Sequence, residues 1–112
     1  MAKYEAELCG SYGQILKEIE RTIPGRSMSA TLEESSDFAA GDTRCAVRVY
    51  ERYSYTGKNR VSISVTLLEA AGRIFVSAVT SGGSQAMLFK VNTFGEESFL
   101  DTLTDILQKY KA

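Results

Sequence analysis

The sequence contains no histidine and no tryptophan, and it has only two cysteines and one proline. Without histidine it lacks the commonest general base near neutral pH, the Ser-His and Cys-His nucleophile pairs, and the ligands of most zinc sites. Cys9 and Cys45 are far from the CxxC spacing of a zinc or redox site. The sequence therefore predicts a protein that is not an enzyme and that binds no metal or cofactor.

The charge is also too well balanced to favour a large class of partners. Thirteen basic and fourteen acidic residues give a net charge of −1, so no global attraction draws the chain to nucleic acid or to an anionic bilayer. No stretch is long and apolar enough to span a membrane, and the first seven residues carry charges where a signal peptide is apolar. We expect one cytoplasmic domain over residues 1–112, with no membrane contact and with both thiols free.

The first third of the chain shows a strand pattern and then a helix pattern. Residues 3–9 alternate between polar and apolar side chains, which predicts a half-buried strand. Ser11 and Gln14 have the spacing of a capping box, and apolar residues then recur at helical intervals, so a helix is expected over about residues 11–22. Pro24 and Gly25 are expected to end it.

The middle of the chain predicts a series of strands. A short strand over residues 27–33 is followed by a polar stretch, interpreted as a surface loop reaching about residue 42. Four further strands are expected over about residues 43–56, 60–69, 73–80 and 85–92. The connections between these four are so short that they join antiparallel neighbours, which gives a meander.

The end of the chain predicts a second helix with one apolar stripe: Phe99, Leu100, Leu103, Ile106, Leu107 and Tyr110. The resulting fold class is α+β, in the order β-α-β-β-β-β-β-α, with a single curved antiparallel sheet of about six strands and both helices on one face. The sheet positions expected to face the helices are Tyr4, Leu8, Met28, Leu32, Val47, Val49, Val61, Ile63, Val65, Ile74 and Val76.

Two resemblances accompany this interpretation. The strand order resembles helix-grip and TATA-binding-protein-like folds, which implies a curved sheet around a long C-terminal helix. The stretches RCAVRVYERYSYTG (44–57), SGGSQA (81–86) and NTFGEESFLD (92–101) resemble a family of small bacterial proteins known as a domain of unknown function. That resemblance implies a bacterial, cytosolic protein, and it transfers no catalytic or binding residue.

The face of the sheet away from the helices is the candidate functional surface. It is expected to combine arginine, aromatic and aliphatic side chains, as a self-association patch does: Arg48, Tyr50, Arg52, Leu68, Phe75, Val79 and Leu88. The leading hypothesis is a non-catalytic interaction module that forms a homodimer through this face.

Two alternatives remain open. Small inward residues, Ala6, Ala30 and Ala78, suggest room for a small apolar ligand between the sheet and the C-terminal helix. Arg48, Tyr50 and Arg52 at every second position suggest weak binding of single-stranded nucleic acid by stacking and phosphate contacts.

Overall fold

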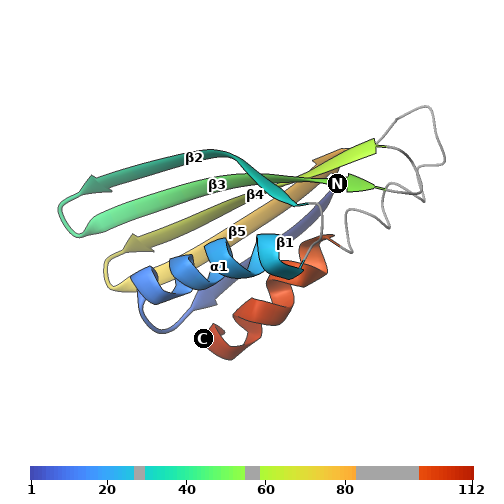
Figure 1. Ribbon diagram of the computed structural model, residues 1–112. Coiled ribbons are helices and arrows are strands. Elements are labelled where there is room, and N and C mark those ends of the chain that lie inside the picture. The colour runs from blue at the N-terminus through green and yellow to red at the C-terminus, as the bar shows by residue number, and fades with distance from the viewer. Residues whose placement is uncertain (27–29, 55–58, 83–98) are drawn as a thin grey trace.

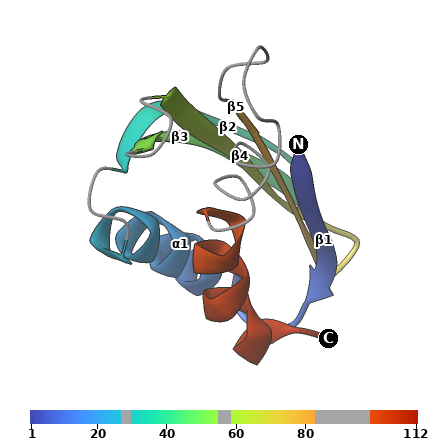
Figure 2. The ribbon, with the colours of Figure 1, turned by 90° about the vertical axis from the view of Figure 1, so that its right-hand side faces the viewer.

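The computed structural model describes residues 1–26, 30–54, 59–82 and 99–112. It is an α+β fold in which five antiparallel strands form one open sheet and two helices lie against one face of it (Figures 1 and 2), so the predicted fold class is confirmed. The predicted strand over residues 85–92 lies outside the described residues. The elements are β1 (Ala2–Leu8), α1 (Tyr12–Arg26), β2 (Thr31–Ala40), β3 (Thr43–Ser54), β4 (Asn59–Ala70), β5 (Arg73–Gly82), a helical segment over residues 99–107 and the 3-10 turn η1 (Gln108–Tyr110).

The strands are ordered β1-β5-β4-β3-β2 across the sheet, and every neighbouring pair is antiparallel. Strands β2 to β5 follow one another as a meander, whereas β1 pairs with β5, so α1 carries the chain from one edge to the other. Tight turns join β2 to β3 and β4 to β5. In the second turn Ala71 and Gly72 both have positive φ (54° and 75°), as the twist of a two-residue hairpin requires.

Helix α1 begins as the sequence predicts and ends later. The Gln14 N–H donates to Ser11 Oγ at 3.3 Å, which confirms Ser11 as the cap. The prediction that the helix stops near residue 22 was wrong, because α1 continues to Arg26 with Pro24 inside its last turn. Proline so close to a helix end removes one backbone hydrogen bond, and the fully buried Ile23 in that turn keeps it against the sheet.

The core formed by the described residues lies on one side of the sheet, between the sheet and the two helices. Both helices cover that side, as predicted (Figure 2). The residues buried there include Val61, Ile63, Val65, Leu67, Ile74, Val76 and Ala78 of the sheet, Ile15, Ile19 and Ile23 of α1, and Phe99, Leu103, Ile106 and Leu107 of the second helix. The predicted stripe of the second helix is thus confirmed. No helix among the described residues is long and apolar enough to cross a membrane.

The C-terminus is fastened to α1 and to β1. The Tyr110 hydroxyl donates to the Glu18 carboxylate on α1, and Lys109 Nζ forms an ion pair with the same carboxylate. The Cys9 N–H donates to the Tyr110 carbonyl (2.6 Å), and the Ala112 N–H donates to the Glu7 carbonyl (3.0 Å). These bonds hold the second helix in place at the end of β1.

Two strand predictions need correction. The segment interpreted as a surface loop forms most of β2, whose ten residues are all exposed, so no burial pattern marks it in the sequence. In β3 the predicted faces are reversed: Arg48 and Tyr50 point toward the helices, while Val47 and Val49 point away and are half-buried. Among the other predicted core positions, Leu32 is 51% exposed on β2, and Met28 lies outside the described residues.

Candidate functional site

The residues of the predicted interaction face divide between the two sides of the sheet. Arg48, Tyr50 and Arg52 lie on the inner side, opposite the inward residues Val65, Ile63 and Val61 of β4. Leu68, Phe75 and Val79 lie on the outer side, as predicted, and each is half-buried. Leu88 is outside the described residues. The candidate surface therefore keeps Leu68, Phe75 and Val79 and loses Arg48, Tyr50 and Arg52.

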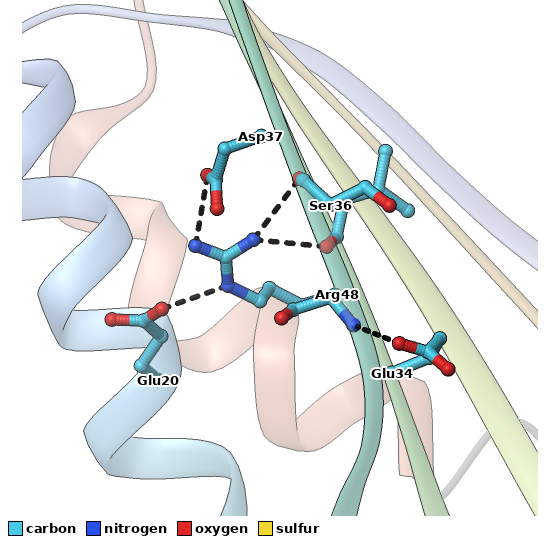
Figure 3. A network of polar contacts seen from close by, with 7 residues as sticks. Glu20, Glu34, Ser36, Asp37 and Arg48 are labelled. Carbon is cyan, nitrogen blue, oxygen red and sulfur yellow. Dashed lines mark hydrogen bonds and ion pairs between the residues drawn. The ribbon is translucent and has the colours of Figure 1, made fainter.

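Arg48 is the centre of a polar network on the inner side (Figure 3). Its Nε donates to Glu20 Oε2 of α1 at 2.8 Å, and its Nη2 donates to Asp37 Oδ1 of β2 at 3.0 Å. Its Nη1 donates to the carbonyls of Ser36 (3.2 Å) and Val47 (3.0 Å). The side chain is 8% exposed, while the Glu20 and Asp37 side chains are 41% and 61% exposed. One buried guanidinium thus ties α1 to the edge of the sheet.

The pKa shifts of Arg48, Tyr50 and Arg52 indicate that these inner residues have a structural role. Burial disfavours the Arg48 cation, but the hydrogen bonds to Glu20 and Asp37 outweigh it and raise the pKa of Arg48. Burial raises the pKa of Tyr50 to about 12, and none of the described residues forms a hydrogen bond with the Tyr50 hydroxyl. The Arg52 guanidinium lies 4.6 Å from the centre of the Phe99 ring on the second helix, and burial lowers the pKa of Arg52.

The outer side of the sheet carries a continuous line of apolar side chains. Phe38 of β2 is paired with Cys45 of β3, Cys45 with Leu68 of β4, and Leu68 with Phe75 of β5. Directly paired residues share one face of an antiparallel sheet, so these four form a line across the strands, here named the apolar row. The row crosses the sheet near the two tight turns.

The flanks of the apolar row are polar or mixed. The next pairs along the strands join Val47 to Thr66 and Thr66 to Ser77, and beyond them Val49 faces Ser64, which faces Val79. At the β1 end, Glu7 pairs with Phe75, and the Arg73 guanidinium binds Glu7 through two hydrogen bonds (2.9 and 3.0 Å). These hydrogen bonds lower the pKa of Glu7.

The apolar row is accessible to solvent, and the surface beside it is concave. Phe38 is 70% exposed, and the other three members are half-buried by their neighbours on the sheet. Beside Leu68 and Phe75 the surface is hollowed by about 420 Å³, and Glu5, Thr66 and Ser77 line the hollow with them. An apolar centre with a polar rim is the anatomy of a protein contact surface.

Comparison with known proteins places the chain in a family. The model of a family of unknown function, DUF6054, matches residues 1–111. The chain belongs to this family. No curated protein and no solved structure matches the chain. The DUF6054 description assigns no activity.

Other chemistry of the DUF6054 chain is sparse in the described part. There, no group of three or more cysteine or acidic side chains is placed to hold a metal ion. Cys9 and Cys45 are both free, as predicted. Sequence reasoning missed Phe38 and Cys45 as members of the outer surface. The dipeptide Gly41-Asp42 was the available signal, because glycine followed by aspartate between two runs is typical of a hairpin turn.

Proposed function

We propose that this protein is a non-catalytic, cytoplasmic interaction module that forms a homodimer through the outer face of its sheet, with the apolar row at the centre of the contact. The observation that carries the proposal is the unbroken line of Phe38, Cys45, Leu68 and Phe75 on the side opposite the helices. In a sheet with one face in water, each strand alternates so that its polar residues lie on that face. The apolar row departs from this rule on four neighbouring strands.

A second copy suits this surface because a two-fold contact needs a patch that complements itself. The row runs across the strands, so two copies can stack face to face with one row against the other. Thr66 and Ser77 beside it would then meet their counterparts, and the charged part of the rim consists of Glu5, which lines the hollow, and Arg73, whose guanidinium lies 5.0 Å from the centre of the Phe75 ring. The Glu7–Arg73 pair stays at the margin, where it remains hydrated.

Phe75→Glu tests the proposal, because it places a charge within the apolar row. We expect light scattering to give a dimer for the native protein at tens of micromolar, roughly ten times a ~1 μM dissociation constant, and a monomer for the variant. Gln14→Glu, which adds the same charge on the exposed side of α1, should leave the dimer intact. Leu68→Glu repeats the test on the next strand, and circular dichroism checks that each variant folds.

Two results would reject the homodimer. One is a native protein that is monomeric at those concentrations. The other is a dimer that persists in folded Phe75→Glu and Leu68→Glu, which would place the contact elsewhere.

A further inference from the structure

Strand β2 is an open edge of the sheet. It pairs with β3 on one side, and no other described strand pairs with it. All ten of its residues are exposed. A strand paired on one side only leaves every second backbone N–H and carbonyl directed outward, where an extended segment can add to the sheet.

The part of β2 available for pairing is its second half. A bulge interrupts the register between Leu32 and Glu34, and the Ser35 N–H donates to Glu34 Oε1 at 3.2 Å. From Ser36 to Ala40 the register with β3 is regular and no proline is present. Five regular residues are enough for one added strand of ordinary length.

The opposite edge is less accessible. The backbones of Lys111 and Leu8 form an antiparallel β-bridge at the end of β1. The backbone hydrogen bonds between residues 7–9 and 110–112 cover the same end of the strand. The chain's own C-terminus thus occupies part of the β1 edge. Among the described residues, contacts cover the Leu8 end of the β1 edge, whereas no strand covers the regular half of β2.

Charge selects what can pair with β2. The strand contains Glu33, Glu34 and Asp37 and no basic residue. Two copies of such a strand repel each other, which is a known protection against edge-to-edge self-association. The same carboxylates attract a strand with basic side chains, and Asp37 keeps 61% of its side chain exposed although it binds Arg48.

An apolar contact lies next to these charges. Phe38 is on the outer face, and a hollow of about 280 Å³ at the same edge is lined by Phe38, Ala39, Ala40, Thr43, Arg44 and Cys45. The Arg44 guanidinium is bound by Glu69 at 2.7 Å, so its charge is compensated within the sheet. An added strand that alternates apolar and basic residues would place the first beside Phe38 and the second on the face of Asp37.

We propose that the free edge of β2 binds an extended segment of another protein, one that alternates apolar and basic side chains, and adds it to the sheet as a further strand. This partner pairs with the backbone edge of the sheet, whereas the homodimer uses its outer face. The two contacts share Phe38 and Cys45, and each has its own test.

The test uses a seven-residue peptide of alternating lysine and valine, blocked at both ends, and the full-length protein labelled for NMR. We expect saturable shifts of β2 and β3 amides below about 1 mM peptide, and none with the matched glutamate–valine peptide. Methylation of the valine backbone nitrogens should abolish binding, because it removes the donors that a strand addition needs.

Two double variants test the role of charge. Glu33→Gln with Glu34→Gln should weaken the lysine–valine peptide at least threefold, while Asp101→Asn with Asp105→Asn removes the same charge from the exposed side of the second helix and should change little. The proposal is overturned by absence of saturable binding, by equal binding of the glutamate–valine peptide, by shifts that map away from β2, or by equal effects of the two double variants. If the glutamine variant does not fold, the two peptides with the native protein still decide the question.

Discussion

The neighbouring strands β3 and β4 place opposite kinds of residue on the same side of the sheet. On the side covered by the helices, the buried residues of β4 are all aliphatic: Val61, Ile63, Val65 and Leu67. At the paired positions β3 presents Arg52, Tyr50, Arg48 and Ala46. On the outer side the order is partly inverted, with Val47 and Val49 of β3 opposite Thr66 and Ser64 of β4.

The difference follows from the distance of each strand from the edge. β4 is the central strand, so a charge in the middle of its inner side would have no access to water. β3 is next to the edge strand β2, where Glu20 and Asp37 reach the Arg48 guanidinium and still keep much of their own surface hydrated. A buried charge is tolerated where its partners are not fully desolvated. Three predictions test this contrast.

The largest effect is expected in β4. Ile63 is fully buried in the centre of the sheet, and Ile63→Ala should lower the free energy of unfolding by about 3–4 kcal/mol through lost burial and a residual cavity. Urea titration measures the change. Ser64→Ala, one residue along on the outer face, is the control and should stay within about 0.5 kcal/mol. A cost below about 1.5 kcal/mol for Ile63→Ala would mean that β4 is not the centre of the core.

A smaller loss is expected for the polar network of β3. Arg48→Met keeps an unbranched side chain but leaves Glu20 and Asp37 without their shared cation, and should cost about 2 kcal/mol, less than a fully buried pair because both carboxylates remain partly hydrated. Arg60→Met removes an exposed ion pair with Glu51 and should cost less than about 1 kcal/mol. Equal costs for the two variants would show that burial adds nothing to the Arg48 network.

The same contrast explains what the sequence predicted and what it did not. In β1, β4 and β5 a run of apolar residues occupies the inner side, so alternation identified both the strands and their inner faces, although Leu68, Phe75 and Val79 lie on the outer side. In β3 both sides hold apolar residues, and the two valines made the wrong side look like the core. The correct side is set by Glu20 and Asp37, which lie 28 and 11 residues away from Arg48 in the sequence.

Strand β2 and the apolar row were hidden for a related reason. An edge strand with ten exposed residues has no burial pattern, and its existence depends on the backbone ladder with β3. Leu68 and Phe75 were assigned to the outer face correctly, because β4 and β5 alternate cleanly. Phe38 and Cys45 joined them only through the register of pairing, which one sequence does not determine.

The smallest effect at neutral pH is expected for Tyr50, an inner residue of β3 whose buried hydroxyl has no hydrogen-bond partner in the part of the chain that the structure describes. Tyr50→Phe removes a polar atom that folding desolvates without compensation, so the free energy of unfolding at pH 7 should change by less than about 1 kcal/mol, toward greater stability.

The stability at alkaline pH tests whether the Tyr50 hydroxyl is desolvated in the folded chain, because a site that merely accepts phenylalanine would show no dependence on pH. The pKa of Tyr50 is raised to about 12 in the folded chain, against about 10 for an exposed tyrosine. Between these values the unfolded chain has released the proton and the folded chain has not, so the native protein loses stability as the pH rises from about 10 to 12, by on the order of 2 kcal/mol. Tyr50→Phe should lack that part of the decline, so its advantage over the native protein should be largest near pH 12. Urea titrations of both proteins at pH 7, 10 and 11.5 measure the difference, and parallel declines would show that the Tyr50 hydroxyl is hydrated or bonded in the folded state.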